Sequence, residues 1–553
     1  MNKHYDTIVI GSGCGGSAAA ALMSSLRHRT LLIEKNKAIG GRAALYEKDG
    51  FKLDHGHILA RCDKGPHGEV LRLVGCADLM PGFSYSQNWP IRAWLGDRQI
   101  DLYPSLRRLF LTGKMGRVGR SIDMKAGEFI ALARMAARQT FMSEREIEKF
   151  DQVDLKTFLS RYRHNPYFRV FLEGFSVGIF GSPVWEASAG EMIRIFRNVN
   201  RDLGAVGYPT NGEGVSAIPK AFIKAARRHG AEIMTGAEVQ SIVIENGRAT
   251  GVMVNGEKIA AERVISNAGI MPTVTRLAGA GHFESSYVRT ISNLKYSCSG
   301  LSFKFALKKK ITDYVWGFEI PFDVQKSYND MIAGRRPDKF IVMFFASSNI
   351  DPGLAPEGCQ TISCISGGPV VEPGTFNWSP WMRDIRSQIE RMLPGINENI
   401  VFCKEDNPDH IAAPFAGVVT VGVAVGVGVR VGEVVGLDET ATDAASGVGV
   451  TGLGWPRATD TPVTATRITS RPDSRNSHHG RAPKPLEVAG VPVSPASTRA
   501  RMASATPAAS PGWAMRLSEA LSRTSMSAMV ILLPQTCGER LAGPVQLGLH
   551  GAF

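Results

Sequence analysis

Residues 7–16 read TIVIGSGCGG, an apolar run followed at once by a glycine-rich turn. The apolar run predicts a buried parallel strand, and the alanine-rich residues 15–26 predict the helix that follows it. Gly11 permits the tight turn, Gly13 lets backbone amides approach a diphosphate, and Gly16 lets the helix and the strand pack closely. The start of the helix would face the negative charge, so this turn favours a bound dinucleotide.

A second apolar run, TLLIE at residues 30–34, ends in an acid. Glu34 follows the glycines by about twenty residues, where a carboxylate can accept hydrogen bonds from a ribose diol and disfavours a 2′-phosphate. The segment Gly40-Gly41-Arg42 comes directly after. These features favour FAD over NAD, because the longer flavin dinucleotide needs another close backbone approach and a cation near its phosphates.

At this point the chain resembles the large FAD-binding superfamily that includes amine oxidases, phytoene desaturases, carotenoid isomerases and retinol saturases. A second block, residues 208–244, is similar to the segment that returns the chain to the flavin domain in phytoene desaturase-like proteins. It contains Gly212 and Gly214, an amphipathic helix at 218–228 and a strand that begins near Val239. The order of these features matches the family.

Residues 246–269 complete the second block. Asn246-Gly247 is a hairpin signal, and the strands 251–254 and 258–265 form a small antiparallel unit. Residues 264–269 match the family's strand end beside the flavin. Two segments roughly two hundred residues apart match one family, which chance glycine placement does not readily produce, and the resemblance covers about the first four hundred residues.

The resemblance implies FAD as the cofactor and a set of residues that bind it. In this family pattern the backbone of Val239 holds the adenine. Catalytic residues are not assigned, because the flavin ring exchanges the hydride and the protein supplies orientation and a dry pocket. The expected cofactor-binding residues are Gly11, Gly13, Gly15, Gly16, Glu34, Lys35, Gly40, Gly41, Arg42, Val239 and Asn267.

A further glycine-containing cluster, residues 50–56, precedes a histidine. His57 lies near the expected flavin and is a candidate acid or base. The competing interpretation, which we favour, is a histidine that backbone groups satisfy in a glycine-rich turn. No metal site is predicted, since the pairs Cys359/Cys364 and His478/His479 are weak zinc candidates.

Residues 102–142 are apolar with many bases and few acids, and they predict two or three amphipathic helices. A basic amphipathic surface can dock on anionic lipid, which would suit a polyene substrate dissolved in a bilayer. The alternative, which we slightly favour, is that these basic residues form the solvent-exposed face of lid helices. Residues 142–161 resemble the helical lid of the family. The aromatic residues that either line a hydrophobic tunnel or belong to the core are Phe168, Phe171, Phe175 and Phe180.

The predicted fold class is α/β, with a discontinuous Rossmann-type FAD-binding domain and an α+β substrate domain. Strands at 301–307, 340–345 and 358–364 and a helix at 381–393 would form the sheet-floored substrate domain. The expected segments are 1–75 for the first FAD-binding part, 76–204 for the helical lid and substrate part, 205–275 for the returning FAD-binding part, 276–413 for the substrate domain and 414–553 for an irregular tail.

The composition changes near residue 415. Downstream come Val-Gly repeats and then abundant Ala, Thr, Pro, Ser and Arg, with Lys484 the single lysine. Such a segment can bury little, and it lacks the Gly-Asp pair with which the superfamily normally ends. We interpret it as the product of a shifted reading frame or a rearranged gene end, which would weaken or abolish FAD binding. Sequencing of the coding DNA tests this interpretation. If none of the alternative reading frames encodes a Gly-Asp motif, the interpretation is wrong.

Composition agrees with an intracellular enzyme. The 553 residues, 44% of them hydrophobic, allow two or three domains, and eight unclustered cysteines indicate a reducing compartment without a disulfide framework. The start of the chain leads straight into a strand, so no signal peptide is expected, and no apolar run is long enough to span a bilayer. The formal charge of +13 does not indicate nucleic acid, because the bases are spread out and no recognition motif accompanies them. We expect a cytoplasmic location, with peripheral attachment to the inner membrane face as the alternative.

The expected function is FAD-dependent hydride exchange with a hydrophobic polyene or isoprenoid, of the desaturase, saturase or isomerase type. The fold alone does not fix the reaction. A flavin amine oxidase is the second enzymatic interpretation, and it predicts an aromatic pair beside the flavin. A third is a non-catalytic, truncated relative that binds lipid or membrane.

Overall fold

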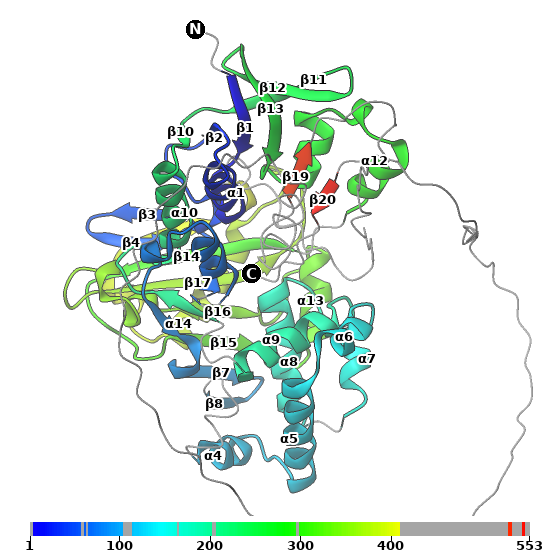
Figure 1. Ribbon diagram of the computed structural model, residues 1–553. Helices are drawn as coiled ribbons and strands as arrows, with labels where there is room; N and C mark the ends of the chain where they lie inside the picture. The colour runs from blue at the N-terminus through cyan, green and yellow to red at the C-terminus, as the bar shows by residue number, and fades with distance from the viewer. Residues whose placement is uncertain are drawn as a thin grey trace, which may run out of the picture. The chain divides into compact units, whose positions relative to one another are not determined.

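Two larger β-sheets organise the described part of the chain (Figure 1). The computed structural model describes residues 4–56, 60–61, 63, 65–102, 113–162, 165–201, 206–294, 298–409, 529–532 and 545–547. All of these residues belong to one unit of the chain.

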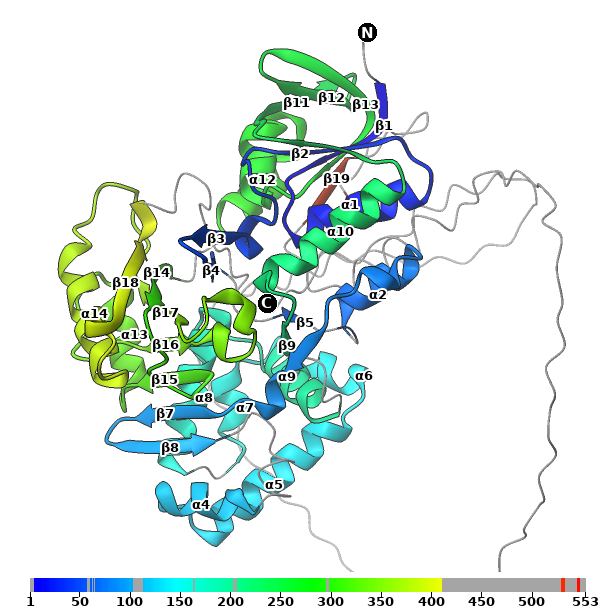
Figure 2. The same cartoon turned by 90° about the vertical axis from the view of Figure 1, so that its left-hand side faces the viewer.

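The first sheet has the Rossmann arrangement. Its strand order is β10-β2-β1-β13-β12-β11, and β10, β2, β1 and β13 run parallel. Helices α1 and α10 pack against each other beside the parallel strands (Figure 2). The expected discontinuous α/β domain is confirmed, because β1 and β2 come from the first block and the other strands from the second. The elements are β1 (His4–Ile10), α1 (Cys14–Ser25), β2 (Thr30–Glu34), α10 (Ala217–Arg228), β10 (Glu232–Thr235), β11 (Val239–Glu245), β12 (Arg248–Val254) and β13 (Glu257–Ser266).

Strand β13 takes part in two kinds of pairing. Its beginning pairs antiparallel with β12, and residues 260–266 pair parallel with β1. The turn between β11 and β12 is the predicted hairpin, with Asn246 and Gly247 both at positive φ, 52° and 72°. These are the conformations that a tight hairpin of this type requires. The antiparallel unit is therefore an extension of the parallel sheet.

The second sheet has the order β18-β14-β17-β16-β15-β7-β8. Its strands are β7 (Ile91–Leu95), β8 (Arg98–Leu102), β14 (Ser299–Leu307), β15 (Trp316–Ile320), β16 (Val342–Phe345), β17 (Gln360–Gly368) and β18 (Ile400–Asp406). Helices α13 (Val324–Ile332) and α14 (Ser379–Met392) pack against it. The strands predicted at 301–307, 340–345 and 358–364 all lie in this sheet.

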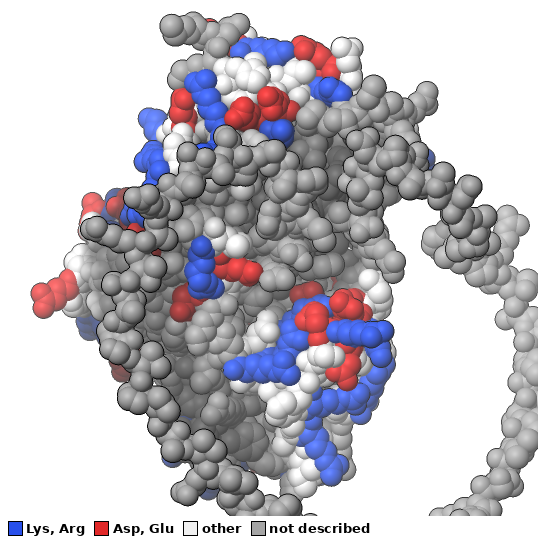
Figure 3. All heavy atoms as spheres, in the orientation of Figure 1, with Lys and Arg blue, Asp and Glu red and all other residues white. Residues whose placement is uncertain are grey.

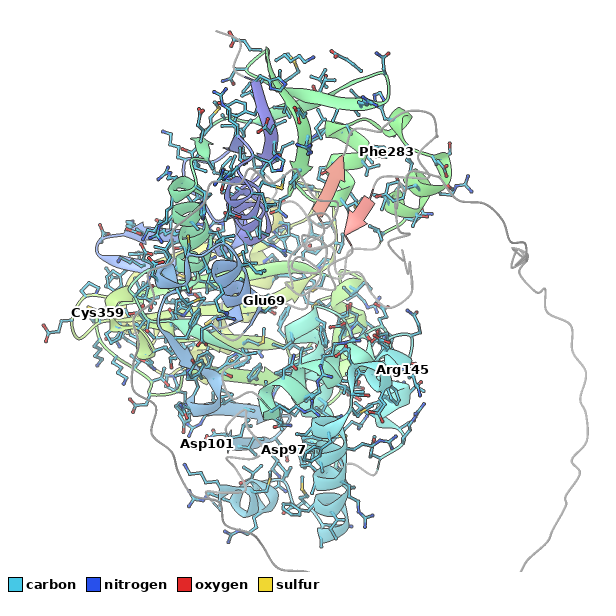
Figure 4. The ribbon with its side chains drawn as sticks, viewed as in Figure 1. Glu69, Asp97, Asp101, Arg145, Phe283 and Cys359 are labelled. Atoms are coloured by element: carbon cyan, nitrogen blue, oxygen red, sulfur yellow. The ribbon has the colours of Figure 1, made fainter. Side chains whose placement is uncertain are left out.

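The β7–β8 hairpin was not expected in the segment read as a helical lid. It joins the second sheet through parallel pairing of β7 with β15. The residues of β7 alternate between buried and half-buried positions, which is the period of a strand. Asp101 lies on this hairpin and pairs with Arg92 across it at 2.8 Å (Figure 4). Asp97, at the turn, accepts a hydrogen bond from Tyr167 at 3.0 Å.

Helices lie beside the second sheet (Figure 2). They are α4 (Lys114–Ser121), α5 (Ala126–Phe141), α6 (Glu144–Ile147), α7 (Leu155–Leu159), α8 (Pro166–Phe180) and α9 (Ala189–Arg201). Helix α8 packs closely on the sheet through two glycines. A Cβ on Gly174 would lie 2.5 Å from Ile320, and one on Gly178 would lie 2.6 Å from Met343. Residues 103–112 of the predicted amphipathic segment lie outside the described residues.

Smaller elements connect the two sheets. The hairpin of β3 (Leu45–Lys48) and β4 (Phe51–Asp54) contacts β17. A three-stranded sheet contains β5 (Ala60–Arg61), β9 (Val206–Pro209) and β6 (Phe83–Tyr85), and α2 (Pro66–Leu73) lies between β5 and β6 in the chain. Helix α12 (Ser285–Ser292) follows β13 through a short helical segment.

Two short strands belong to the tail. Strand β19 (Met529–Leu532) pairs antiparallel with the end of β13, and β20 (Val545–Leu547) pairs with β19. Residues 410–528 lie outside the described residues, and so does the predicted change of reading frame near residue 415.

Candidate functional site

The turn between β1 and α1 has the geometry that its glycines predict. Gly11 has φ of +92°, and a Cβ on Gly16 would lie 1.9 Å from the carbonyl oxygen of Gly11. Gly13 is the N-cap of helix α1, which has no side-chain cap and no acid in its first turn. No side-chain cap therefore binds the first amides of the helix, and the helix dipole favours an anion there.

Glu34 lies directly beside this turn. Its Oε2 accepts hydrogen bonds from the Ser12 amide at 2.8 Å and from the Ser12 hydroxyl at 2.7 Å. The other carboxylate oxygen accepts from the amide and the side chain of Asn36 at 2.9 and 3.0 Å. Glu34 is only 4% exposed, whereas Lys35 is exposed. The structure thus brings the predicted carboxylate to the predicted glycine turn.

The second glycine turn touches the first. Gly40 and Gly41 have φ of +118° and +56°, and a Cβ on Gly41 would lie 3.3 Å from Cα of Gly13. Gly13 and Gly40 also form an isolated parallel bridge. A side chain on any of these residues would fill the space that two approaching backbones share. We call the two turns together the cradle: residues 11–16 and 40–42.

A cation lies at the start of α1. Burial raises the pKa of the Cys14 thiol to about 11, and the nearby guanidinium of Arg42 opposes this rise. Arg42 also directly follows Gly41, whose Cβ would lie 3.3 Å from Cα of Gly13, so its backbone lies close to the start of the helix. A cation at this place can balance the charge of a diphosphate.

Asn267, the residue directly after β13, lies beside the cradle. Its amide donates to the carbonyl of Ile10 at 2.8 Å, which fixes it beside the end of β1. A Cβ on Gly15 would lie 2.8 Å from Nδ2 of Asn267, and one on Gly13 would lie 3.1 Å from its Oδ1. Nδ2 is buried and has no hydrogen-bond partner among the described residues. An orphan donor in a glycine cradle fits a ligand with acceptor oxygens, as a dinucleotide diphosphate has.

Val239 lies near the same edge. It begins β11, is 5% exposed and pairs with Val254. Two residues earlier, the amide of Ala237 donates to the backbone carbonyl of Glu34 at 3.0 Å. The predicted residues from both blocks are therefore gathered at the carboxyl ends of β1, β2 and β13. Their individual roles toward a cofactor stay predictions.

A buried acid beside the cradle was noticed in the sequence but given no role. Asp54 ends β4 and accepts hydrogen bonds from the hydroxyl of Tyr208 and from the amide of Val215, the latter at 3.0 Å. Burial raises the pKa of Asp54 to about 6, against the lowering effect of these bonds. A Cβ on Gly214 would lie 2.6 Å from Asp54 Oδ1, so only glycine fits there.

His55 follows Asp54 and connects the hairpin to the second glycine turn. The His55 amide donates to the carbonyl of Ala44 at 2.9 Å, and the Gly56 amide donates to that of Arg42 at 3.2 Å. Burial lowers the pKa of His55 to about 4, and Lys404 and Lys304 lower it further. His57, the candidate acid or base, lies outside the described residues.

A buried charge cluster lies on the second sheet near His55. Lys304 donates to Asp406 and to the Ser302 hydroxyl, the latter at 2.8 Å, and Lys404 contacts Asp406 at 3.0 Å. Sequence reasoning missed this cluster. Residues 301–307 were read only as an alternating strand, and the partner Asp406 is about one hundred positions away in the chain.

The described residues contain no group of three or more His, Cys, Asp or Glu placed to hold a metal. Of the weak zinc candidates, Cys359 precedes β17 near the surface and Cys364 is buried inside that strand (Figure 4). His478 and His479 lie outside the described residues. No helix within the described ranges is long and apolar enough to cross a membrane.

The fold and the cradle define a dinucleotide-binding protein of the Rossmann class. Residues 9–74 match the family model of the NAD(P)-binding Rossmann-like domain. An oxidoreductase from Methanosarcina mazei has the same fold, with a TM-score of 0.54 and 18% identity over 73% of this chain and 88% of that one. A protein from Pyrococcus furiosus has a TM-score of 0.52 and 18% identity over 72% and 87%.

Curated relatives carry the identification further. A 4,4′-diapophytoene desaturase from Staphylococcus haemolyticus is 22% identical over 67% of this chain and 77% of its own length. A 4,4′-diapolycopene oxygenase from Methylomonas is 24% identical over 72% and 84%. A chloroplastic prolycopene isomerase from Daucus carota is 29% identical over 50% and 48%. The chain is similar to carotenoid desaturases and related oxidoreductases at modest identity, and this agrees with the resemblance based on its two glycine-containing blocks.

Proposed function

We propose that this protein is a FAD-dependent oxidoreductase that exchanges hydride with a hydrophobic polyene or isoprenoid substrate. The names of its relatives, carotenoid desaturases, an oxygenase and an isomerase, support this substrate class. Two adjoining glycine turns with a cation beside them support a cofactor longer than NAD. Bound FAD would supply the acceptor or donor of the hydride.

The cradle and two residues beside it, Glu34 and Asn267, bind and orient the cofactor in this proposal. Glu34 takes the sugar of the adenosine half, because a buried carboxylate accepts bonds from both hydroxyls of a ribose. The amides at the start of α1 and the Arg42 guanidinium balance the diphosphate. Asn267 donates its orphan Nδ2–H to an acceptor of the cofactor, which removes the cost of an unsatisfied buried donor.

A run of aromatic contacts between the helices and the β3–β4 hairpin is the observation that carries the proposal. Phe175 of α8 stacks on Phe196 of α9 with ring centroids 6.1 Å apart, and it lies 6.5 Å from Trp316 of the second sheet. Trp316 in turn meets Phe345 at 6.4 Å. Phe175 and Phe196 are half-buried, whereas Trp316 and Phe345 are buried.

The same run reaches the hairpin beside the second glycine turn. Phe345 lies 5.4 Å from Tyr208, whose hydroxyl donates to Asp54 at the end of β4. The Phe175–Phe196 contact is stacked, whereas the other contacts of the run are tilted or edge-on. Aromatic rings offer an apolar, polarisable surface that suits a conjugated chain. A polyene bound along this run would lie in a dry environment with one end near the cradle.

The visible spectrum of the purified full-length protein tests the proposal. We expect flavin bands, and the nucleotide released on denaturation should co-elute with FAD on chromatography. Under anaerobic conditions, a polyene presented in liposomes should bleach these bands, or a reduced flavin should be reoxidised by it, while the absorption of the polyene shifts. Glu34→Gln is the variant that should weaken FAD retention without touching the aromatic run.

Other outcomes separate the alternatives. A protein that binds no flavin and still sediments with liposomes would support the lipid-binding, truncated relative. Flavin bands bleached by an amine and not by any polyene would support the amine oxidase. Either result would overturn the proposal.

We further propose that helix α5 attaches the protein to an anionic membrane surface. Ile130 and Phe141 are 50% and 78% exposed, and the exposed Arg134 and Arg138 lie on the same part of the helix. Spacings of three and four residues put these side chains on neighbouring positions of one helix face. Figure 3 shows Lys and Arg side chains along the region of α5, mixed with acids nearer α6. Apolar anchors ringed by cations favour peripheral binding to the cytoplasmic leaflet.

Liposome sedimentation tests this attachment. The protein should sediment with vesicles that contain an anionic phospholipid and much less with purely zwitterionic ones. The double change Arg134→Glu and Arg138→Glu should abolish the difference, and Phe141→Ser should weaken it. Arg289→Glu, an exposed arginine on α12, is the matched control. Equal loss in the control would contradict a role of α5.

A further inference from the structure

Ser12, the middle residue of the first Gly-Ser-Gly turn, uses every polar group that it has. It is completely buried. Its amide and hydroxyl both donate to Glu34 Oε2, and its Oγ accepts from the Gly40 amide at 3.1 Å. Its carbonyl accepts from the Ser17 hydroxyl at 2.7 Å. One small residue therefore contacts the end of β2, the second glycine turn and helix α1.

Glu34 accepts four hydrogen bonds from described residues, two from Ser12 and two from Asn36. A carboxylate offers about four lone-pair sites, so the carboxylate of Glu34 has no vacant site in this arrangement. A ribose diol can bind it only by replacing one of these donors. Two of the four donors are side-chain groups: the Ser12 hydroxyl and the Asn36 amide.

The two side-chain donors differ in their surroundings. Ser12 has no exposed surface, so water cannot replace its hydroxyl. Asn36 is half-buried, and its side chain bonds to Glu34 from the rim of the site. Removal of the Ser12 hydroxyl would leave a buried charge and the Gly40 amide each short of a partner, which is costly. Removal of the Asn36 side chain would free a lone pair that water or a ribose hydroxyl can reach.

We propose that Ser12 is a positioning residue of the cofactor site and that Asn36 is a displaceable stand-in for the ribose hydroxyls. Ser12 holds the Glu34 carboxylate and the second glycine turn in the arrangement that a ribose and a diphosphate need. Asn36 satisfies the outer side of the carboxylate until a sugar replaces it. This inference rests on the proposed function, because it concerns the same dinucleotide site.

Titration calorimetry with ADP-ribose, on full-length protein freed of bound nucleotide, tests the inference. Ser12→Ala should raise the Kd about tenfold, whereas Asn36→Ala should leave it within about threefold of wild type or lower it. The two variants are matched, since each deletes one side-chain donor to the same carboxylate. On a Glu34→Gln background, Ser12→Ala should raise the Kd by less than about threefold, because Ser12 acts through the charge of Glu34.

Several outcomes would overturn the inference. Equal weakening by Ser12→Ala and Asn36→Ala would remove the distinction between the two donors. An undiminished effect of Ser12→Ala on the Glu34→Gln background would reduce Ser12 to a packing residue. Should Ser12→Ala fail to fold by circular dichroism, Ser12→Cys, which keeps the volume but donates weakly, takes its place with the same expected direction.

The proposed function and the inference fail in different ways. If the wild type binds FAD and ADP-ribose and Ser12→Ala binds them equally tightly, the inference alone is wrong. If the folded wild type binds neither, the proposed function is wrong and the inference falls with it.

Discussion

Lys304 and Lys404 stand directly opposite each other in the β14–β18 ladder, and Asp406 accepts a hydrogen bond from both. Like charges in directly opposite positions destabilise a sheet, and here the shared carboxylate offsets them. The side chains of Lys304 and Asp406 are only 3% and 7% exposed. Burial lowers the pKa of Lys304, while Asp406 raises it. The cluster is therefore stable only when its acid is present.

This arrangement predicts that replacing Asp406 lowers the free energy of unfolding more than replacing Lys304 does. Asp406→Leu leaves a buried ammonium facing a second lysine, so it should lower the free energy of unfolding by roughly 3–5 kcal/mol. Lys304→Met should cost less, because Lys404 still pairs with Asp406. The double variant should recover much of the loss of Asp406→Leu. Urea denaturation measures all three, and equal costs of the two single changes would contradict the shared-acid arrangement.

Asp54 predicts a component of stability that falls with pH. Its pKa in the folded protein is about 6, above the ordinary 3.8, so the folded state holds this proton more tightly than the unfolded state. The stabilisation is complete below about pH 4 and is lost as the pH rises to about 6. In Asp54→Asn, urea midpoints should therefore gain more between pH 4 and 6 than in wild type. The same pH slope in both proteins would contradict a titrating Asp54.

For His55 we expect the opposite dependence of stability on pH, in nearly the same pH range. Its pKa in the folded protein is about 4, below the ordinary 6.5, because it is buried near Lys404 and Lys304. The unfolded state then binds the proton more tightly, so this contribution makes stability rise from about pH 4 to 6.5. His55→Asn should flatten that rise. A steeper rise in His55→Asn than in wild type would contradict it.

Arg194 predicts a stability effect in the helical region. Its guanidinium lies 2.5 Å from Glu144, 2.6 Å from Asp151 and 2.9 Å from Glu191, and its side chain is 19% exposed. Arg194→Ala removes the cation that the three acids share, although Glu144 keeps its pair with Arg197, and it should lower the free energy of unfolding by roughly 1–3 kcal/mol. Arg169→Ala is the control, since that exposed residue forms its ion pair with a different acid, Glu173, and its loss should cost less than about 0.5 kcal/mol.

Position 16 is expected to accept glycine and no larger residue. The obstacle to a Cβ there is a backbone carbonyl, which cannot rotate away. Gly16→Ala should shift α1 against β1 and weaken FAD binding by about a hundredfold or more, as chromatography of retained nucleotide would show. Gly127→Ala on α5 meets nothing within 4 Å and should stabilise by up to about 1 kcal/mol. Full FAD retention in Gly16→Ala would contradict the close packing.

Local sequence signals predicted the cradle well. Residues 7–16 and Glu34 carry a periodicity and a spacing that depend on neighbours in the chain, and Asn246-Gly247 carries its turn type in two residues. These features lie where they were expected. The contact of Glu34 with the turn follows from parallel pairing of β1 and β2, which the motif itself implies.

Features made by distant residues were not predictable in this way. Five residues of β7 alternate like any short strand, and nothing nearby tells that their partner is β15, more than two hundred residues later. The bond between Lys304 and Asp406 and that between Tyr208 and Asp54 depend on the same long-range pairing. Ser12 was missed for another reason. The glycine motif allows any residue at this position, so the role of Ser12 becomes visible only in its burial and hydrogen bonds.

The pairing of β1 with β13 means that β1 gains one of its neighbours only late in the synthesis of the chain. Strand β1 ends at Ile10, and its neighbour on one side is complete only at Ser266. At about 5–20 residues per second, the ribosome needs on the order of ten to fifty seconds to deliver that partner. During this interval strand β1 lacks its partner β13, and for most of it helix α1 also lacks its packing partner α10. A ribosome-bound chain that stops before residue 257 should therefore bind a chaperone that recognises apolar segments more than one that extends beyond Ser266.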